Sequence, residues 1–356
     1  MVYGANGFSG RAIAVRLAEA GHDVLLAGRH SRRVEALARS LGRPWRVFDL
    51  RDQERIRQGL AGVKVVLSAA GPFLTTAGPM MEACVGVGVH YLDLAGEWPV
   101  FALAQRLGPE AEAAKVMLMP GAGSTIVVSD CLLARAAAAA PQARVLRVID
   151  AFPGVVSRGT LRSALGLVAG GVIVRRAGAV ERIAGGGPPR WYSFGDGERA
   201  CMPISGPDVI TGQHTTGVAN IEAYLEARVG CRAALWLGEL AADLCGETAF
   251  RTAGAALIAT WPERPAESAQ RQADVAVVVE AEDPWRRVTR FGVRTLDGYT
   301  VSTDTAASIV ARVVAGDHPP GFQTPAGVFG ANLIVGLASV WPFDASPLAP
   351  PTPRRS

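Results

Sequence analysis

Gly4-Ala5-Asn6-Gly7-Phe8-Ser9-Gly10 stands near the start of the chain, after the short apolar run Met1-Val2-Tyr3. The window Ser9–Ala20 that follows has apolar residues at helical spacing. A GxxGxxG pattern is informative in this strand–loop–helix context. The first glycine allows a tight turn, the second lets backbone amides approach a diphosphate, and the third lets the helix pack close to the sheet. We predict a dinucleotide-binding βαβ unit, and we expect the native chain to begin a few residues earlier because the first strand is so short.

The first 120 residues continue this alternation of β-rich and helical windows, which is typical of a parallel sheet wound with helices. The strand candidates are Asp23–Ala27, Trp45–Phe48, Val63–Ala69, His90–Asp93 and Lys115–Met119. The further helical windows are Ser31–Leu41, Gln53–Leu60, Ala77–Val87 and Pro99–Ala113. The fold class predicted is α/β, with a Rossmann-type doubly wound parallel sheet.

Beyond Asp130 the pattern becomes α+β. Strands are expected at Val145–Phe152, Arg190–Tyr192, Ala273–Glu282 and Val288–Thr295, with a loop from Tyr192 through Asp208. Helices are expected at Thr160–Val168, Thr303–Ala315 and Asn332–Val340. We therefore divide the chain into residues 1–135, 136–302, 303–343 and a proline-rich, frayed tail, 344–356.

Composition narrows the class of protein. An apolar fraction of 49% and a charged fraction of 19% fit a globular enzyme and exclude a disordered or fibrous chain. The five cysteines form no CxxC pair, which disfavours a disulfide scaffold or a zinc site and favours a reducing compartment. The net charge is +4, but the arginines are scattered, so we expect no nucleic-acid partner. With neither an export signal nor a long apolar run, the expected location is the cytoplasm, with no integral membrane span and no metal.

The end of the second predicted strand indicates which dinucleotide binds. An NAD site usually has an Asp or Glu there, which binds the ribose hydroxyls. Here the strand ends in Gly28-Arg29-His30-Ser31, so a guanidinium takes the place of the carboxylate. Arg29 can bind a 2′-phosphate, and Ser31, Arg32 and Arg33 can add donors. The sequence predicts a preference for NADP(H), with Asp49 bordering the adenine; the alternative is a solvated loop arginine.

Three further glycine- and proline-rich loops follow predicted strands: Ala69–Phe73, Asp93–Glu97 and Pro120–Ser124. Ligands of doubly wound sheets lie at the carboxyl ends of the strands, although each loop is also compatible with an ordinary tight turn. The residues that we expect to bind the coenzyme are Gly4, Asn6, Gly7, Phe8, Ser9, Gly10, Arg29, Ser31, Arg32, Asp49, Ala70, Gly71, Pro72, Phe73 and Gly96.

Five motifs, in this order, carry a resemblance: GANGFSG, AGR, SAAGPFLTTAGPMMEAC, GVHYLDLAGE and PGAG…SDCLLA. Over Met1–Arg135 the chain resembles the saccharopine dehydrogenase-like NADP-binding family, in particular its shorter bacterial members of the trans-acting enoyl reductase type. The resemblance is looser over Pro203–Glu222 and Tyr299–Gly330. It implies a Rossmann domain that binds NADP(H), a second domain that contacts a small-molecule substrate, and a carboxyl-terminal helix that returns to the first domain. It also implies hydride transfer to a C=N or a C=C bond.

The chain departs from the family at one position. Family members often read Gly-Phe-Asp after the sixth strand, whereas this chain reads Gly123-Ser124-Thr125. In saccharopine reductases an acidic residue in this region helps to handle the amine of the substrate. Its replacement by a hydroxyl favours a neutral substrate, such as a lipid- or polyketide-like enoyl compound, over an amino-acid imine.

Hydride transfer needs a matching proton donor. The candidates are Tyr91, Glu97, His214 and Tyr299. Tyr91 lies two residues before Asp93 on a strand, so both side chains should face the same side. Glu97 is at the coenzyme edge, and His214 lies in a polar, glycine-bounded loop. Each also has an ordinary structural explanation, and water can protonate an enolate without any side-chain acid.

Two other functions stay open. The first is an NADP(H)-binding redox sensor or assembly protein without turnover, because a Rossmann fold does not dictate catalysis. The second is an amino-acid imine reductase of the saccharopine type. A metalloenzyme and a nucleophilic hydrolase are disfavoured, because the sequence contains neither HExxH nor GxSxG. A homodimer is the default assembly.

Overall fold

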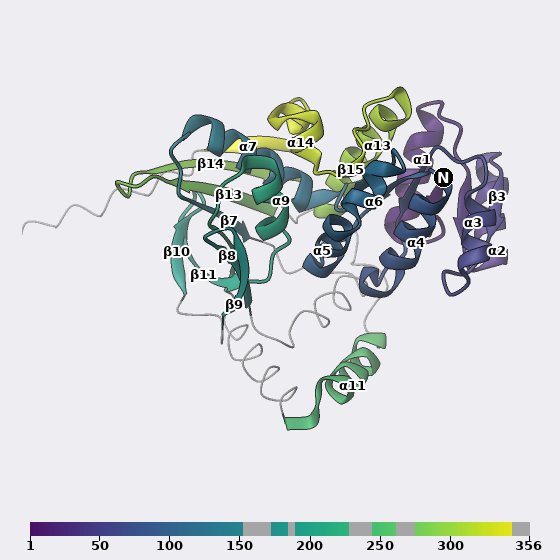
Figure 1. Ribbon diagram of the computed structural model, residues 1–356, viewed down its shortest axis with the longest axis horizontal. Coiled ribbons are helices and arrows are strands. Elements are labelled where there is room, and N and C mark those ends of the chain that lie inside the picture. The colour runs from purple at the N-terminus through teal and green to yellow at the C-terminus, as the bar shows by residue number, and fades with distance from the viewer. Residues whose placement is uncertain (152–171, 184–188, 228–243, 261–274, 344–356) are drawn as a thin grey trace, which may run out of the picture.

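The computed structural model describes residues 1–151, 172–183, 189–227, 244–260 and 275–343 (Figure 1). Its amino-terminal part is a seven-stranded sheet in the order β15-β6-β5-β4-β1-β2-β3, and every neighbouring pair is parallel. The strands are β1 (Val2–Tyr3), β2 (Leu26–Gly28), β3 (Trp45–Val47), β4 (Val65–Ser68), β5 (His90–Asp93), β6 (Met117–Met119) and β15 (Gly321–Phe322). The predicted doubly wound Rossmann sheet is confirmed, and the order reverses between β1 and β4.

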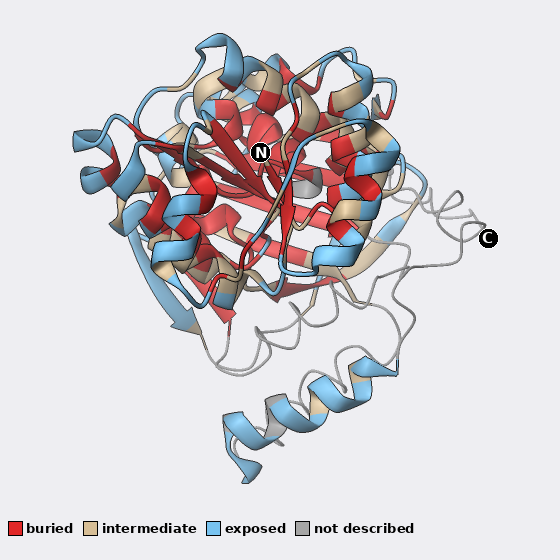
Figure 2. Cartoon of the chain, turned by 90° about the vertical axis from the view of Figure 1, so that its right-hand side faces the viewer, coloured by how far each residue is buried: buried red, intermediate tan, exposed pale blue. Residues whose placement is uncertain are grey.

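Helices cover both faces of this sheet: α1 (Phe8–Glu19), α2 (Ser31–Leu41), α3 (Gln53–Leu60), α4 (Phe73–Val87), α5 (Trp98–Arg106) and α6 (Gly108–Ala113). Because successive residues of a strand point to opposite faces, each strand contributes to two cores. Val2 and Leu92 pack on the side of α1 and α2, whereas Tyr3 and Tyr91 pack on the side of α3, α4 and α5. Figure 2 shows the resulting buried layers on either side of the strands.

The second sheet is mixed, with the order β10-β11-β12-β7-β13-β14-β16 and the hairpin β8–β9 joined to β12. Its strands are β7 (Val145–Ala151), β8 (Val172–Arg176), β9 (Ala179–Ile183), β10 (Arg190–Ser193), β11 (Glu198–Ile204), β12 (Ile221–Glu226), β13 (Val275–Glu282), β14 (Val288–Thr295) and β16 (Val340–Phe343). Helices α7 (Ser124–Ala139) and α9 (Asp208–Thr216) pack against it. Helix α11 (Glu247–Ala259) stands apart from both sheets (Figures 1 and 2).

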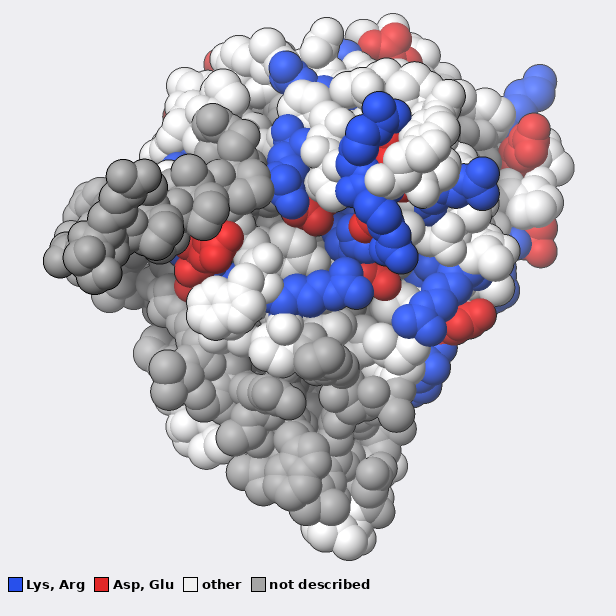
Figure 3. Space-filling model, turned by 90° about the vertical axis from the view of Figure 1, so that its left-hand side faces the viewer, with Lys and Arg blue, Asp and Glu red and all other residues white. Residues whose placement is uncertain are grey.

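The face of the second sheet that points away from α7 and α9 carries ion pairs. Arg147 lies 2.7 Å from Glu282 and 3.2 Å from Glu222, and Arg294 lies 2.8 Å from Asp196. Basic and acidic side chains are interleaved at this end of the molecule (Figure 3). Several arginines of this basic chain are therefore paired with carboxylates within the protein.

Three predictions about the second half were wrong. The loop expected from Tyr192 through Asp208 contains β11, because Cys201 and Pro203 pair with β12. The helix expected at Asn332–Val340 is only a 3-10 turn, Ala331–Ile334, followed by β16. The polar loop expected around His214 is helix α9. The helix expected at Thr160–Val168 lies outside the described residues, as does the tail 344–356.

The carboxyl-terminal part returns to the first sheet, as the resemblance implied. Helix α13 (Gly298–Ala315) packs against α1 and α7, and β15 pairs with β6 at the sheet edge. Helix α13 begins earlier than predicted because Asp297 caps it. Its side chain accepts hydrogen bonds from the backbone N–H groups of Tyr299 and Thr300. Helix α7 crosses the boundary that we placed at residue 135, and this division of the chain stays a prediction.

Asp130 of α7 connects three helices. Its Oδ1 accepts the hydroxyl of Thr215 on α9 at 2.6 Å, and its Oδ2 accepts the N–H of Ala326 in α14 (Pro325–Phe329) at 2.7 Å. Burial raises the pKa of Asp130 to about 7. Thr324, which caps α14, lies 2.6 Å from Thr215. This buried network fixes the carboxyl-terminal segment to the body of the protein.

The variant Asp130→Asn should unfold more easily, because an amide nitrogen cannot accept the Ala326 N–H bond. At about pH 5 we expect a loss of roughly 1–3 kcal/mol in the free energy of unfolding, measured by urea denaturation. Since the pKa of Asp130 is raised on folding, from 3.8 to about 7, the fold favours the protonated acid. The advantage of the wild type should therefore shrink as the pH rises from 3.8 to about 7. An advantage that grows over this range would contradict the assignment.

Candidate functional site

The glycine loop between β1 and α1 is packed too closely for most side chains. Gly4 has φ +80°, and a Cβ there would lie 2.9 Å from the backbone of Ala69 and Ala70, after β4. A Cβ on Gly10 would lie 2.4 Å from the carbonyl oxygen of Gly4. Gly7 is less restricted, with 3.2 Å to the same oxygen. The loop thus folds against the start of its own helix and against the neighbouring strand end.

Helix α1 begins without a side-chain cap. Its N-cap residue is Gly7, and its first turn contains no acidic residue. Helix α13 begins beside it, where the rings of Phe8 and Tyr299 meet edge to face with centroids 5.0 Å apart. Asp297 satisfies the first turn of α13, so the two adjacent helix starts differ. Only α1 of this pair presents a first turn with no side-chain cap, and such a turn can bind an anion through backbone N–H groups and the helix dipole.

Asp93 connects the loops that follow β5 and β6. Its Oδ1 accepts the N–H groups of Ala95 at 2.9 Å and Gly121 at 2.8 Å, and its Oδ2 accepts the hydroxyl of Tyr91 at 2.7 Å. Burial raises the pKa of Asp93 to about 6. The sequence did not single out Asp93 as a functional residue, although it predicted correctly that Tyr91 and Asp93 face the same side. This carboxyl positions two of the three loops that we expected to line the coenzyme.

Tyr91 is a poor proton donor in this arrangement. It is completely buried, and its hydroxyl is committed to Asp93. Burial, with the nearby charge of Asp93, raises the pKa of Tyr91 well above its ordinary value. The Tyr91 hydroxyl thus helps to hold Asp93 in place, and its predicted role as proton donor stays a prediction.

The other predicted donors lie in different places. Glu97 is buried at the start of α5, and its Oε2 accepts the N–H of Gly96 at 3.0 Å. Tyr299 lies at the glycine loop through its contact with Phe8. His214 is exposed on α9, and the centroid of its ring lies 4.8 Å from the ring centroid of Phe322 in β15. Two of the candidates therefore adjoin the predicted coenzyme loops, whereas His214 lies at the sheet edge.

The loop between β4 and α4 lies at the same edge. Gly71 and Pro72 are exposed, and Ala70 and Phe73 are half-buried. The Thr76 hydroxyl donates to the carbonyl of Ala70 at 2.6 Å, which fixes the loop onto the first turn of α4. The accessible backbone of this loop is compatible with the predicted contact to a coenzyme.

The adenosine end has an accessible basic group. Arg29, Ser31 and Arg32 are exposed where β2 ends and α2 begins. The Nε–H of Arg29 donates to His30 at 3.2 Å. In the described part of the chain, neither Arg29 nor Arg32 forms an ion pair with a carboxylate, so both guanidinium groups are available to a phosphate.

Asp49 follows β3 and faces the same region. It forms two hydrogen bonds of 3.0 Å with the guanidinium of Arg51, which lower the pKa of Asp49. Asn6 lies beside this end of the site, because its Oδ1 would be only 3.0 Å from a Cβ on Gly28. Asp49 thus has a partner of its own, and its predicted contact with adenine stays a prediction.

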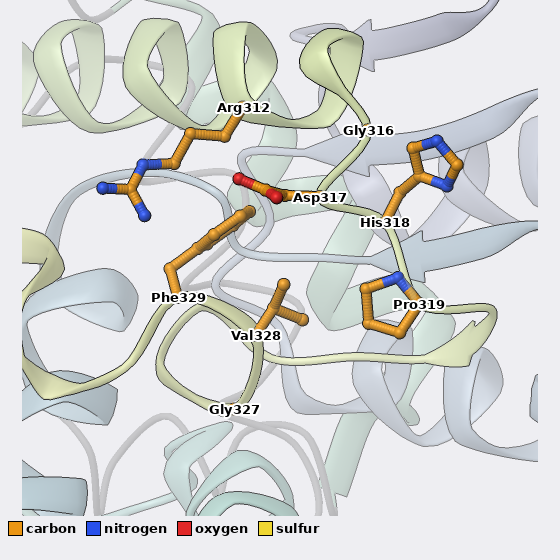
Figure 4. Close-up of a pocket in the computed structure, with 8 residues that line it drawn as sticks. All are labelled: Arg312, Gly316, Asp317, His318, Pro319, Gly327, Val328 and Phe329. Atoms are coloured by element: carbon orange, nitrogen blue, oxygen red, sulfur yellow. The ribbon is translucent and has the colours of Figure 1, made fainter.

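A surface hollow of about 570 Å³ lies at the other end of α13, lined by Arg312, Asp317, His318, Val328 and Phe329 (Figure 4). Helix α13 has 18 residues, with Tyr299 in its first turn and Arg312 in its last. Because a helix rises about 1.5 Å per residue, Tyr299 and Arg312 are roughly 20 Å apart along the helix. This hollow is therefore not part of the coenzyme site.

An open helix start, a glycine loop and three loops at the carboxyl edge of a parallel sheet define a dinucleotide-binding Rossmann domain. Residues 1–119 match the family model of the saccharopine dehydrogenase NADP binding domain. The resemblance predicted from the motifs is confirmed: the amino-terminal third of the chain matches the model of this NADP binding domain.

Relatives and solved structures agree with this assignment. Trans-acting enoyl reductases of Mycobacterium tuberculosis and Mycobacterium bovis are 35% identical over 104 residues, which cover 27% of this chain and 25% of theirs. The apo saccharopine dehydrogenase (L-Glu forming) of Saccharomyces cerevisiae has a TM-score of 0.64 at 12% identity, over 96% of this chain and 99% of that chain. The homospermidine synthase of Legionella pneumophila, solved with NAD, has a TM-score of 0.63 at 12% identity, over 100% of this chain and 94% of that one. At this identity the likeness concerns the fold alone.

No described helix is both long and apolar enough to span a bilayer. No group of three potential metal ligands occurs among the residues searched.

The variant Gly4→Ala tests the close packing of the loop, with Gly21→Ala as its matched control. Both glycines have φ near +80°, but a Cβ on Gly21 would meet nothing within 4 Å. We expect Gly21→Ala to cost about 1–2 kcal/mol through backbone strain alone. Gly4→Ala should cost clearly more in urea denaturation, because it adds a clash with the Ala69–Ala70 backbone. Equal losses in the two variants would show that the close approach does not constrain the fold.

Proposed function

We propose that this protein is an NADPH-dependent reductase that transfers hydride to a C=C or C=N bond of a small-molecule substrate. The observation that carries the proposal is the uncapped start of α1 beside the accessible guanidinium of Arg29. The diphosphate would bind the backbone N–H groups at the start of α1, over Gly7 and the residues that follow. Arg29, with Ser31 and Arg32, would bind the 2′-phosphate that distinguishes NADPH from NADH.

The nicotinamide end would lie among the loops that Asp93 connects. Gly96 and Gly121 present backbone close to this edge, and Glu97 and Tyr299 are the nearest polar side chains of the predicted set. NADPH, when bound, supplies a hydride to an electrophilic carbon. The residues of the chain orient the ring, exclude water and provide the matching proton.

An enoyl substrate is the favoured choice within this class. The relatives in mycobacteria are named trans-acting enoyl reductases, and they match over the amino-terminal third only. The family's acidic residue after the sixth strand is replaced at Gly123-Ser124-Thr125. Both features support a neutral, lipid- or polyketide-like substrate over an amino-acid imine.

The first test of the coenzyme assignment is the variant Arg29→Asp. A carboxylate at this position would repel the 2′-phosphate, so we expect NADPH to bind on the order of 100-fold more weakly. The affinity for NADH should change little, and both can be measured by fluorescence titration. Arg39→Asp is the control, because Arg39 is an exposed arginine in the last turn of α2, the helix that begins just after Arg29. An unchanged ratio of the two affinities in Arg29→Asp would place the 2′-phosphate elsewhere.

The second test is turnover. We expect the wild-type protein to oxidise NADPH when an α,β-unsaturated acyl thioester is the substrate. The loss of NADPH absorbance measures this oxidation. Turnover of a cyclic imine alone would indicate the saccharopine-type alternative. Tight binding of NADPH with no turnover of either probe would contradict the reductase and favour a redox sensor or assembly protein.

A further inference from the structure

Two buried carboxyl groups of the second domain lie where α7, α9 and β7 meet. Asp150 points to the same face of β7 as Leu146 and Val148, which belong to the core that also contains α7. Asp208 begins α9, and its Oδ1 accepts the hydroxyl of Ser129 on α7 at 2.5 Å. Asp208 also lies close to β12, because a Cβ on Gly206 would be 2.9 Å from Asp208 Oδ2 and 2.6 Å from the Cβ of Ala223. Ala223 pairs with Val148, two residues before Asp150 on the same face of β7.

The topology brings this pair toward the coenzyme edge. Helix α7 starts directly after the loop that follows β6, with Gly123 as its N-cap, and Ser129 is in its second turn. A short connection, residues 140–144, reverses the chain, so β7 runs back along α7. Asp150, at the carboxyl end of β7, therefore returns toward the helix end that adjoins Gly121 and Asp93.

One polar atom of this pair is left without a partner. Asp150 is only 8% exposed, and its Oδ1 accepts and donates no hydrogen bond. Thr211, one turn after Asp208 on α9, is fully buried, and its hydroxyl is also unpartnered. Buried polar atoms are nearly always hydrogen-bonded, so each exception calls for an explanation, such as a bound water, an ion or a catalytic role. Asp130, by contrast, has partners for both of its oxygens.

The surroundings determine which carboxyl holds a proton. Asp208 has the Ser129 hydroxyl to stabilise its charge, whereas Asp150 Oδ1 has no donor. Burial, followed by the charge of Asp208, raises the pKa of Asp150 well above its ordinary value. Two adjacent buried carboxyls do not both ionise readily. Burial raises the pKa of Asp208 as well, but Asp150, whose Oδ1 has no donor, is the member that we expect to keep its proton.

We propose that Asp150 is the proton donor of the reductase, with Asp208 and Ser129 as the residues that keep it protonated. The proposal rests on the proposed function, because a hydride acceptor needs a proton. Asp150 gives its proton to the atom that receives the electron pair of the reduced double bond. The π bond breaks, a C–H bond and a second C–H or N–H bond form, and NADPH is oxidised. Asp150 is left as a carboxylate and takes a new proton from water.

The test compares Asp150→Asn with Asp130→Asn. Asparagine keeps the shape of the side chain at position 150 but cannot supply the proton. A general acid contributes about 10²–10⁴-fold, so we expect kcat with a crotonyl thioester to fall at least about 100-fold. The melting temperature of Asp150→Asn should change little, because the amide has nearly the shape of the protonated carboxyl and neither group is charged. The matched control, Asp130→Asn, should melt lower at about pH 5, where the wild type still has its advantage, and keep its kcat within a few-fold.

A second readout needs neither substrate nor coenzyme. In the infrared difference spectrum of wild type minus Asp150→Asn at neutral pH, we expect the carbonyl band of one protonated carboxyl, beside any band from Asp130, whose pKa is about 7 and which both proteins keep. A difference spectrum without that band, or a kcat unchanged in Asp150→Asn while the wild type turns over, would overturn the proposal alone. Wild-type protein that binds NADPH but reduces neither a crotonyl thioester nor pyrroline would overturn the proposed function, and this proposal with it.

Discussion

The uncapped first turn of α1 is the feature on which the rest of the arrangement depends. It exists because two glycines let backbone lie where side chains would clash: Gly4 against the Ala69–Ala70 backbone, and Gly10 against the carbonyl of Gly4. This packing directs the positive end of the helix dipole at the carboxyl edge of the sheet. The loops after β4, β5 and β6 meet at the same edge, so the anion site and the chemistry that we propose share one location.

Buried carboxyls organise the space around that edge, and their hydrogen bonds separate two kinds of role. Asp93 holds two loops and the Tyr91 hydroxyl, and Asp130 holds α9 and α14 on α7. Both use their oxygens fully, as structural groups should. Asp150 leaves one oxygen without a partner at nearly the same depth. The contrast between satisfied and unsatisfied acids gives a physical reason to look for function at Asp150.

Much of the first domain could be predicted from the sequence, because its signals are local. Helices α2 and α3 have the bounds that their periodicity indicated, and β5 begins and ends where its apolar run does. Strand β15 has only two residues and forms through its pairing with β6, so no local sequence pattern predicts it. The threonines and the glycine of helix α9 predict a loop, but burial against Leu133 and Ile221 stabilises the helix. The same reason applies to the site: the glycine loop is a local motif, whereas the partners of Asp93, Asp130 and Asp208 come from distant segments.

Strand β15 has a consequence for how the protein is made. The seventh strand of the nucleotide-binding sheet comes from residues 321–322, and α13 covers α1 from residues 298–315. During synthesis on the ribosome, the edge strand β6 and the apolar side of α1 therefore stay uncovered until α13 and β15 have been translated. More than half of the chain lies between β6 and β15. A nascent chain in that state exposes a strand edge that can pair with other chains. The second domain is then in effect an insertion between the parts of the first, whose core is complete only after residues 298–322 have been synthesised.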